Sequence, residues 1–117
     1  MTARYVPKQA DIVWLDCTPQ SAHEQAGRGP ALVLSPGAYN RKVGLMLCCP
    51  ITTKIKGYPF EVELTGVRGM SGVVLSDQIK SLDWESRHAE FKCKVSSAII
   101  QEVLAKLHTL LEVEQPD

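Results

Sequence analysis

Seven apolar residues near the C-terminus recur at offsets of three and four, which is the spacing of one face of an α-helix. They are Ile99, Ile100, Val103, Leu104, Leu107, Leu110 and Leu111. Neither glycine nor proline interrupts residues 96–112. We therefore predict an amphipathic helix over this segment, with Ser96 or Ser97 as its N-cap. Its apolar face must be buried, most simply against the open side of a sheet.

Short apolar runs rich in strand-forming residues precede this helix, and turns containing glycine or proline separate them. The runs cover residues 12–15, 31–35, 45–49, 60–64, 72–76 and 78–82. The second and third runs are expected to pair as antiparallel neighbours across a loop that contains Tyr39, Asn40 and Gly44. The fourth run alternates apolar and acidic residues, which is typical of a strand near a sheet edge.

Five or six short strands followed by one helix predict a mainly β fold, a small barrel or curled sheet capped by the C-terminal helix. One helical turn is also expected over residues 81–88, with Ser81 as its cap. The chain has 117 residues, of which 44% are apolar and 22% charged. These values are typical of one globular domain, here spanning residues 1–117.

Charge and hydropathy exclude several functional classes. Thirteen basic residues balance thirteen acidic ones, so any site for an anion must be a local patch. No apolar stretch is long enough to span a membrane, and residues 1–10 lack the features of a signal peptide, so we expect a cytoplasmic protein without membrane contact.

The four cysteines form no CxxC motif, and the histidines do not stand at ligand spacing from them. Cys48 and Cys49 are adjacent, and adjacent strand residues point to opposite faces, which suits packing better than bridging. We therefore expect reduced, buried thiols, and neither a metal nor a cofactor.

Three polar segments carry residues that suit RNA chemistry. Residues 23–30 supply an imidazole, a carboxylate and a guanidinium for moving protons and binding an anion. Thr52 and Thr53 supply hydroxyls for a phosphate, and residues 54–60 combine lysines with aromatic rings on which a base can stack. From spacing alone, solvated turn residues are the more common interpretation of such segments.

The same segments, taken in order, resemble the MazF/PemK family of mRNA-cutting toxins from bacterial toxin–antitoxin pairs. The matching motifs are RYVP at residues 4–7, DIVW at 11–14, HEQAG at 23–27, PALVLSP at 30–36, YN at 39–40, PITT at 50–53, KGYPFEV at 56–62 and DQIKSLDW at 77–84. They span nearly the whole chain. The resemblance implies an SH3-like barrel with a C-terminal helix, in agreement with the prediction from the apolar runs.

The resemblance also implies a function. Members of the family are homodimers that cut single-stranded mRNA at short sequence motifs, without a metal and without the ribosome. The products carry a 2′,3′-cyclic phosphate and a 5′-hydroxyl. An acidic antitoxin, MazE-like in this branch, neutralises the toxin by laying its C-terminal segment over the RNA-binding surface.

By matched position, the resemblance implies that Glu24, Thr52 and position 29 carry the catalysis. The family has an arginine at position 29, but this chain has Gly29, and the nearby guanidinium of Arg28 stands one residue too early. Because successive residues of an extended segment point to opposite sides, Arg28 is not expected to replace it by position. We therefore expect an impaired ribonuclease, through an introduced substitution or natural variation.

The RNA-binding residues implied by the same match flank these positions. They are His23, Gln25, Thr53, Lys54, Lys56, Tyr58 and Phe60. Two alternatives stay open beside the nuclease. One is a toxin that acts by binding, as the related gyrase-directed toxins of the same fold do, and the other is an RNA-binding module without activity, which Gly29 keeps open.

Overall fold

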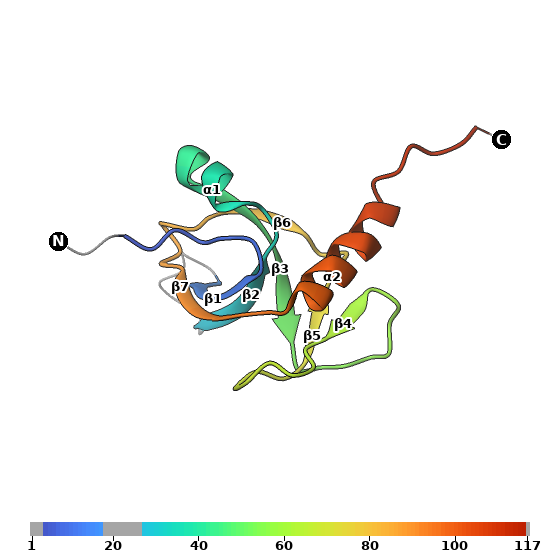
Figure 1. Ribbon diagram of the computed structural model, residues 1–117, viewed down its shortest axis with the longest axis horizontal. Coiled ribbons are helices and arrows are strands. Elements are labelled where there is room, and N and C mark those ends of the chain that lie inside the picture. Colours follow the sequence, from blue (N-terminus) through green and yellow to red (C-terminus); the bar gives the residue numbers. More distant parts are fainter. Residues whose placement is uncertain (1–3, 18–26, 117) are drawn as a thin grey trace.

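The computed structural model describes residues 4–17 and 27–116 as seven strands and two helices (Figure 1). The strands are β1 (Asp11–Asp16), β2 (Arg28–Val33), β3 (Leu45–Thr52), β4 (Glu61–Glu63), β5 (Val73–Leu75), β6 (Lys80–Asp83) and β7 (Glu90–Lys94). The helices are α1 (Gly37–Val43) and α2 (Ser97–Thr109). Within the described residues, no helix is long and apolar enough to cross a membrane.

Strand β3 joins the two parts of the curled sheet. Its first four residues pair antiparallel with β6, Cys48 to Pro50 pair antiparallel with β2, and its last two residues pair with β5. The full strand order is β4-β5-β3-β2-β1-β7, and β6 pairs with β3 outside this path. The last recorded β2–β3 pair is Ala31 with Pro50, and a proline has no N–H to donate to a ladder. The pairing of β3 with β2 therefore stops at Pro50, before the two residues that pair with β5.

The sheet buries apolar side chains on both faces. Ile12, Leu32 and Cys49 belong to one cluster, whereas their neighbours Val13, Val33 and Cys48 belong to a second cluster. This alternation confirms that Cys48 and Cys49 point to opposite faces. Helix α2 covers the first cluster, and Trp84 closes the second and donates an indole hydrogen bond of 2.9 Å to the Asn40 carbonyl.

The C-terminal helix confirms the strongest sequence prediction. Ser96 is its N-cap and accepts a hydrogen bond from the Ile99 amide, and Ile99, Ile100, Val103 and Leu107 are buried against the sheet. Figure 1 shows α2 lying across the side of the sheet that carries β4 and β5. The predicted end was wrong. The helix stops at Thr109, and Leu110 and Leu111 are 51% and 67% exposed because they lie past the part that contacts the sheet.

The six predicted strands are confirmed with shifts of a few residues at their ends, and the pairing of 31–35 with 45–49 and the edge position of β4 are confirmed as well. Helix α1 replaces part of the loop that was expected after Gly37. It is held by its buried Asn40, whose side chain donates to the carbonyls of Pro7 and Ser35, contacts that no local periodicity predicts.

Two other expectations were wrong at the end of the sheet. Ser81 lies inside strand β6, where it pairs with Leu47 of β3, and it therefore cannot cap a helix. Residues 84–88 form turns instead of the expected helical turn. Strand β7 was not predicted. Three of its five residues are charged, and its place in the sheet comes from pairing with β1.

The structure has four free cysteines, and the prediction that their thiols are all buried was wrong. Cys48 and Cys49 are buried, Cys93 is partly buried and Cys17 is exposed at the end of β1. Burial raises the pKa of the Cys48 thiol to about 11 and that of Cys49 to about 12. Both therefore remain protonated and packed at neutral pH.

Candidate nucleic-acid interface

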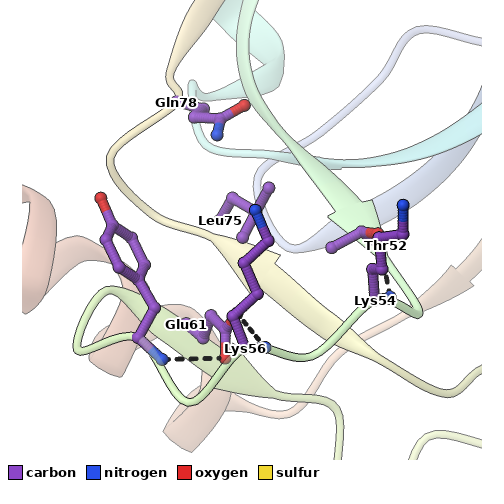
Figure 2. A pocket seen from close by; sticks show the side chains of 7 residues that line it. Thr52, Lys54, Lys56, Glu61, Leu75 and Gln78 are labelled. Atoms are coloured by element: carbon purple, nitrogen blue, oxygen red, sulfur yellow. Dashed lines mark hydrogen bonds between the residues drawn. The ribbon is translucent and has the colours of Figure 1, made fainter.

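A pocket of about 350 Å³ opens at the end of β3, and we call it the Thr52 pocket (Figure 2). Its lining residues are Thr52, Lys54, Lys56, Tyr58, Glu61, Leu75 and Gln78. In Figure 2, Thr52 and Lys54 lie together at one side and the Lys56 side chain extends through the middle. The structure thus brings together four of the residues that the sequence predicted for catalysis and RNA binding, namely Thr52, Lys54, Lys56 and Tyr58.

A second cavity of about 250 Å³ surrounds Gly29, and we call it the Gly29 hollow. Its lining residues are Leu15, Cys17, Gly29, Pro30, Ala31, Cys48, Pro50, Ile51, Lys80, Leu82 and Arg87. Cys48 and Pro50 line this hollow and Thr52 lines the other pocket, and alternate residues of a strand share one face. Lys80 and Gln78 likewise line the hollow and the pocket respectively. The two cavities therefore lie one after the other along one face of β3, and we call this face the groove.

The Thr52 hydroxyl lines this groove, and one of its hydrogen-bonding roles, as an acceptor, is already used within the protein. Its Oγ1 accepts a hydrogen bond of 3.1 Å from the Lys54 amide. A hydroxyl that accepts in one direction keeps its own hydrogen for another acceptor. Thr52 can therefore donate to an anion in the pocket.

The loop that carries the two lysines is held in shape by residues that the sequence prediction did not include. The Glu61 carboxylate accepts hydrogen bonds from the amides of Lys56, Gly57 and Tyr58 at 3.0, 3.0 and 3.3 Å. From α2, the Lys106 ammonium donates to the carbonyls of Pro59 and Glu61 at 2.7 and 3.2 Å. The only signal in the sequence was the acidic residue inside KGYPFEV, which the strand pattern assigned to the water-facing side of an edge strand.

Tyr58 is anchored by a neighbouring carboxylate. Its hydroxyl donates to Asp77, and this hydrogen bond raises the pKa of the Tyr58 phenol. The residue is 42% exposed, and Phe60 packs beside its ring with a centroid separation of 5.9 Å. Tyr58 thus offers a neutral, fixed ring for stacking, while Phe60 supports that ring and does not line the pocket.

Replacing Glu61 with alanine is expected to loosen this loop and weaken RNA binding by about tenfold, because three backbone donors lose their shared acceptor. Glu61→Gln keeps one oxygen acceptor and should lose less. Binding of a fluorescent single-stranded RNA measures both variants, with Glu63→Gln on the same strand as the control. Unchanged binding by Glu61→Ala would show that the loop does not need the carboxylate.

Arg28 and Gly29 face opposite sides of β2. Gly29 pairs with Leu15 and faces the hollow, whereas Arg28 pairs with Asp16 and faces away from it. The Arg28 guanidinium donates to the Asp16 carboxylate at 2.7 Å and to the His88 carbonyl at 2.7 Å. It also lies 3.4 Å from the Glu90 carboxylate. Arg28 is thus bound between β1 and β7, outside the groove.

Other predicted site residues lie elsewhere or outside the described part. Thr53 lines a separate hollow with Trp14 and Met70, and Thr52 lies between that hollow and the Thr52 pocket. His23, Glu24 and Gln25 lie outside the described residues. Among residues 4–17 and 27–116, no group of three His, Cys, Asp or Glu side chains could hold a metal ion.

Comparison with known proteins identifies the family. The model of the PemK-like, MazF-like toxins of type II toxin–antitoxin systems matches residues 8–111. The endoribonuclease toxin MazF of Escherichia coli K12 is 48% identical over 111 residues, which cover 95% of this chain and 99% of that protein. The endoribonuclease PemK of Escherichia coli is 31% identical over 121 residues, covering 95% and 90%.

Solved structures agree with the sequence match. A crystal structure of MazF from Deinococcus radiodurans superposes with a TM-score of 0.83 at 55% identity, covering 92% of this chain and 98% of that one. A chain of a MazE–MazF crystal structure from the same organism gives 0.84 at 49% identity, covering 95% and 100%. The predicted small β fold with a C-terminal helix is confirmed. This chain belongs to the PemK-like, MazF-like toxin family of type II toxin–antitoxin systems.

Proposed function

We propose that this chain is an endoribonuclease toxin that binds single-stranded RNA along the groove formed by the Thr52 pocket and the Gly29 hollow. The observation that carries the proposal is the shared face of β3, which sets a hydroxyl donor, three lysines and an exposed aromatic ring along one path. Relatives that match nearly the full chain are named endoribonucleases. Cations spaced along a groove with a stacking platform suit a single strand of RNA.

The proposed reaction is an internal transfer without a metal. The ribose 2′-oxygen attacks the phosphorus, the bond from phosphorus to the 5′-oxygen breaks, and a 2′,3′-cyclic phosphate and a 5′-hydroxyl form. The 2′-proton passes to a general base, for which Glu24 is the candidate, and a general acid gives a proton to the leaving 5′-oxygen. Thr52 donates a hydrogen bond to the phosphorane as its charge develops.

The proposed activity is impaired because Gly29 supplies no donor at the position where the family has an arginine. Arg28 does not replace it, since its guanidinium is bound to Asp16 and the His88 carbonyl on the other side of β2. His88 and Arg28 together hold the pKa of the Asp16 carboxyl below its ordinary value, His88 contributing more. That carboxylate is therefore ionised at neutral pH and retains Arg28.

We also propose that the chain forms a homodimer and that an acidic antitoxin neutralises it. Solved relatives include MazE–MazF complexes. An acidic peptide segment resembles the RNA backbone in charge and would compete for Lys54 and Lys56 in the same groove.

Replacing Lys56 with methionine should weaken RNA binding and reduce its dependence on salt. Each phosphate contact to a single strand contributes about −0.7 to the slope of log K against log salt, because binding releases counterions. We expect the slope to become less steep by about 0.7 for Lys56→Met and to stay unchanged for Lys42→Met on α1. Titrations with a 2′-O-methyl RNA at several salt concentrations measure this slope. An equal slope for both variants would show that Lys56 does not contact a phosphate.

The activity itself is tested by incubating the chain and its Gly29→Arg variant with a panel of single-stranded RNAs. Fragments ending in 2′,3′-cyclic phosphate, identified by mass, would support the nuclease. RNA binding without cleavage by either protein would support the RNA-binding module instead. Inhibition of purified gyrase, with neither RNA binding nor cleavage, would support the toxin that acts by binding.

A further inference from the structure

The Gly29 hollow contains a guanidinium that the resemblance to the family did not single out. Arg87 lies in the turns between β6 and β7, far from Gly29 in the sequence, and it lines the same hollow. It is half-buried, whereas Lys80, the other cation of the hollow, is exposed. The charges of both groups act on the buried Cys48 thiol and lower its pKa against the larger effect of burial. Both cations therefore lie close to the floor of the hollow.

Arg87 and Arg28 differ in what they bind. Arg28 forms ion pairs with Asp16 and Glu90. Arg87 uses Nη1 to donate to the carbonyls of Asp16 and Cys17, at 3.1 and 2.7 Å, and it forms no ion pair with a carboxylate of the described residues. A guanidinium has five N–H donors, and carbonyls do not neutralise its charge. Arg87 therefore keeps its positive charge and further donors for an anion.

The hollow also has room for a phosphate because position 29 has no side chain. Gly29 lies opposite Leu15, and a Cβ built on it would stand 3.1 Å from the Cys17 Sγ. An arginine at this position would extend from β2 into the space that Arg87 and Lys80 border. The glycine thus leaves the hollow open and accessible from the side of Arg87.

We propose that Arg87 supplies, in this chain, the guanidinium that binds the RNA phosphate in the Gly29 hollow. This proposal rests on the proposed nuclease function and predicts that the chain keeps residual activity without the family's arginine. Arg87 donates hydrogen bonds to the non-bridging oxygens and transfers no proton. The bonds made and broken at phosphorus are those of the reaction given above. Lys80 adds a point charge to the same hollow.

A loss of activity on replacing Arg87 could also have a structural cause, because Arg87 donates hydrogen bonds to the Asp16 and Cys17 carbonyls and so stabilises the end of β1. A double-mutant cycle separates the two roles. Arg87→Met is made in the chain as given and in the Gly29→Arg variant, and single-turnover cleavage of one RNA is followed. If Arg87 only stabilises the end of β1, Arg87→Met should lower the cleavage rate by the same factor in both backgrounds.

We expect Arg87→Met to lower the single-turnover rate by about tenfold to a hundredfold in the Gly29 background and by less than about threefold in the Gly29→Arg background. Arg87→Lys, which keeps the charge, should recover part of the loss. Arg41→Met on α1 removes an arginine remote from the hollow and serves as the control. Thermal unfolding of each variant identifies any that do not fold.

Each remaining outcome has a defined meaning. Equal losses in the two backgrounds, or no loss in the Gly29 background, would overturn the proposal. A chain with Gly29 that shows no cleavage above the RNA-only blank, while the Gly29→Arg variant cleaves, would overturn it as well. Failure of the Gly29→Arg variant to cleave any RNA would instead count against the proposed function.

Discussion

Replacing Gly29 with arginine is expected to raise the rate of RNA cleavage by about a hundredfold to a thousandfold, the usual effect of one donor aimed at charge in a transition state. The new side chain would extend from β2 into the Gly29 hollow, on the face of β3 that carries Thr52. Single-turnover cleavage of a single-stranded RNA, compared between the chain and the variant, measures the gain.

The backbone at Gly29 accepts a side chain at a small local cost. The Cβ would meet the Cys17 Sγ at 3.1 Å, so this thiol must move by a few tenths of an ångström, and Cys17 is exposed at the end of β1. Gly29→Arg combined with Cys17→Ala removes that contact and should be at least as active. Gly29→Ala fills the backbone position without a donor and should give no gain. Equal rates for the chain and for Gly29→Arg would refute the proposed impairment.

Replacing Thr52 with valine should lower cleavage by about a hundredfold to a thousandfold, measured in the more active Gly29→Arg background. Valine keeps the shape of threonine but removes the hydroxyl. In the structure Oγ1 accepts from the Lys54 amide, so the hydroxyl hydrogen is available to the substrate. The substitution therefore removes a donor to the phosphorane and also an acceptor that orders Lys54.

The two losses can be told apart by measuring binding and chemistry separately. Loss of the donor should appear in the single-turnover rate at saturating RNA, while disorder of Lys54 should appear in the dissociation constant. Thr65→Val, on an exposed turn, is the matched control. If the rate at saturation stays within about threefold of the Gly29→Arg parent, well short of the usual effect of a lost donor, Thr52 has no part in the chemistry.

The helix and most strands were predictable because their signals are local. The spacing of the apolar residues Ile99, Val103 and Leu107 defines a buried helical face, and short apolar runs between turns define strands. Both patterns can be recognised without knowing the tertiary contacts of the segment. Helix α1 and strand β7 were missed since neither has a strong local pattern. Asn40 holds α1 through carbonyls of Pro7 and Ser35, and β7 is ordered by its pairing with β1.

Part of the site was predictable in the same way. Short motifs identified Thr52, Lys54, Lys56 and Tyr58, which the structure gathers in one pocket. Glu61 and Lys106 were missed because they bind backbone groups of the loop. Every residue type has these backbone groups, so the sequence does not show which side chains bind them.

The amino-acid sequence by itself determined the family, the apolar faces and the absence of a side chain at position 29. Only the tertiary structure decided that Asp16 and the His88 carbonyl bind Arg28 and that Arg87, distant in sequence, lines the hollow beside Gly29. The physical reason is that side chains alternate across a strand, so the face each one reaches depends on strand register. Register is set by pairing between remote segments, and local sequence does not contain it.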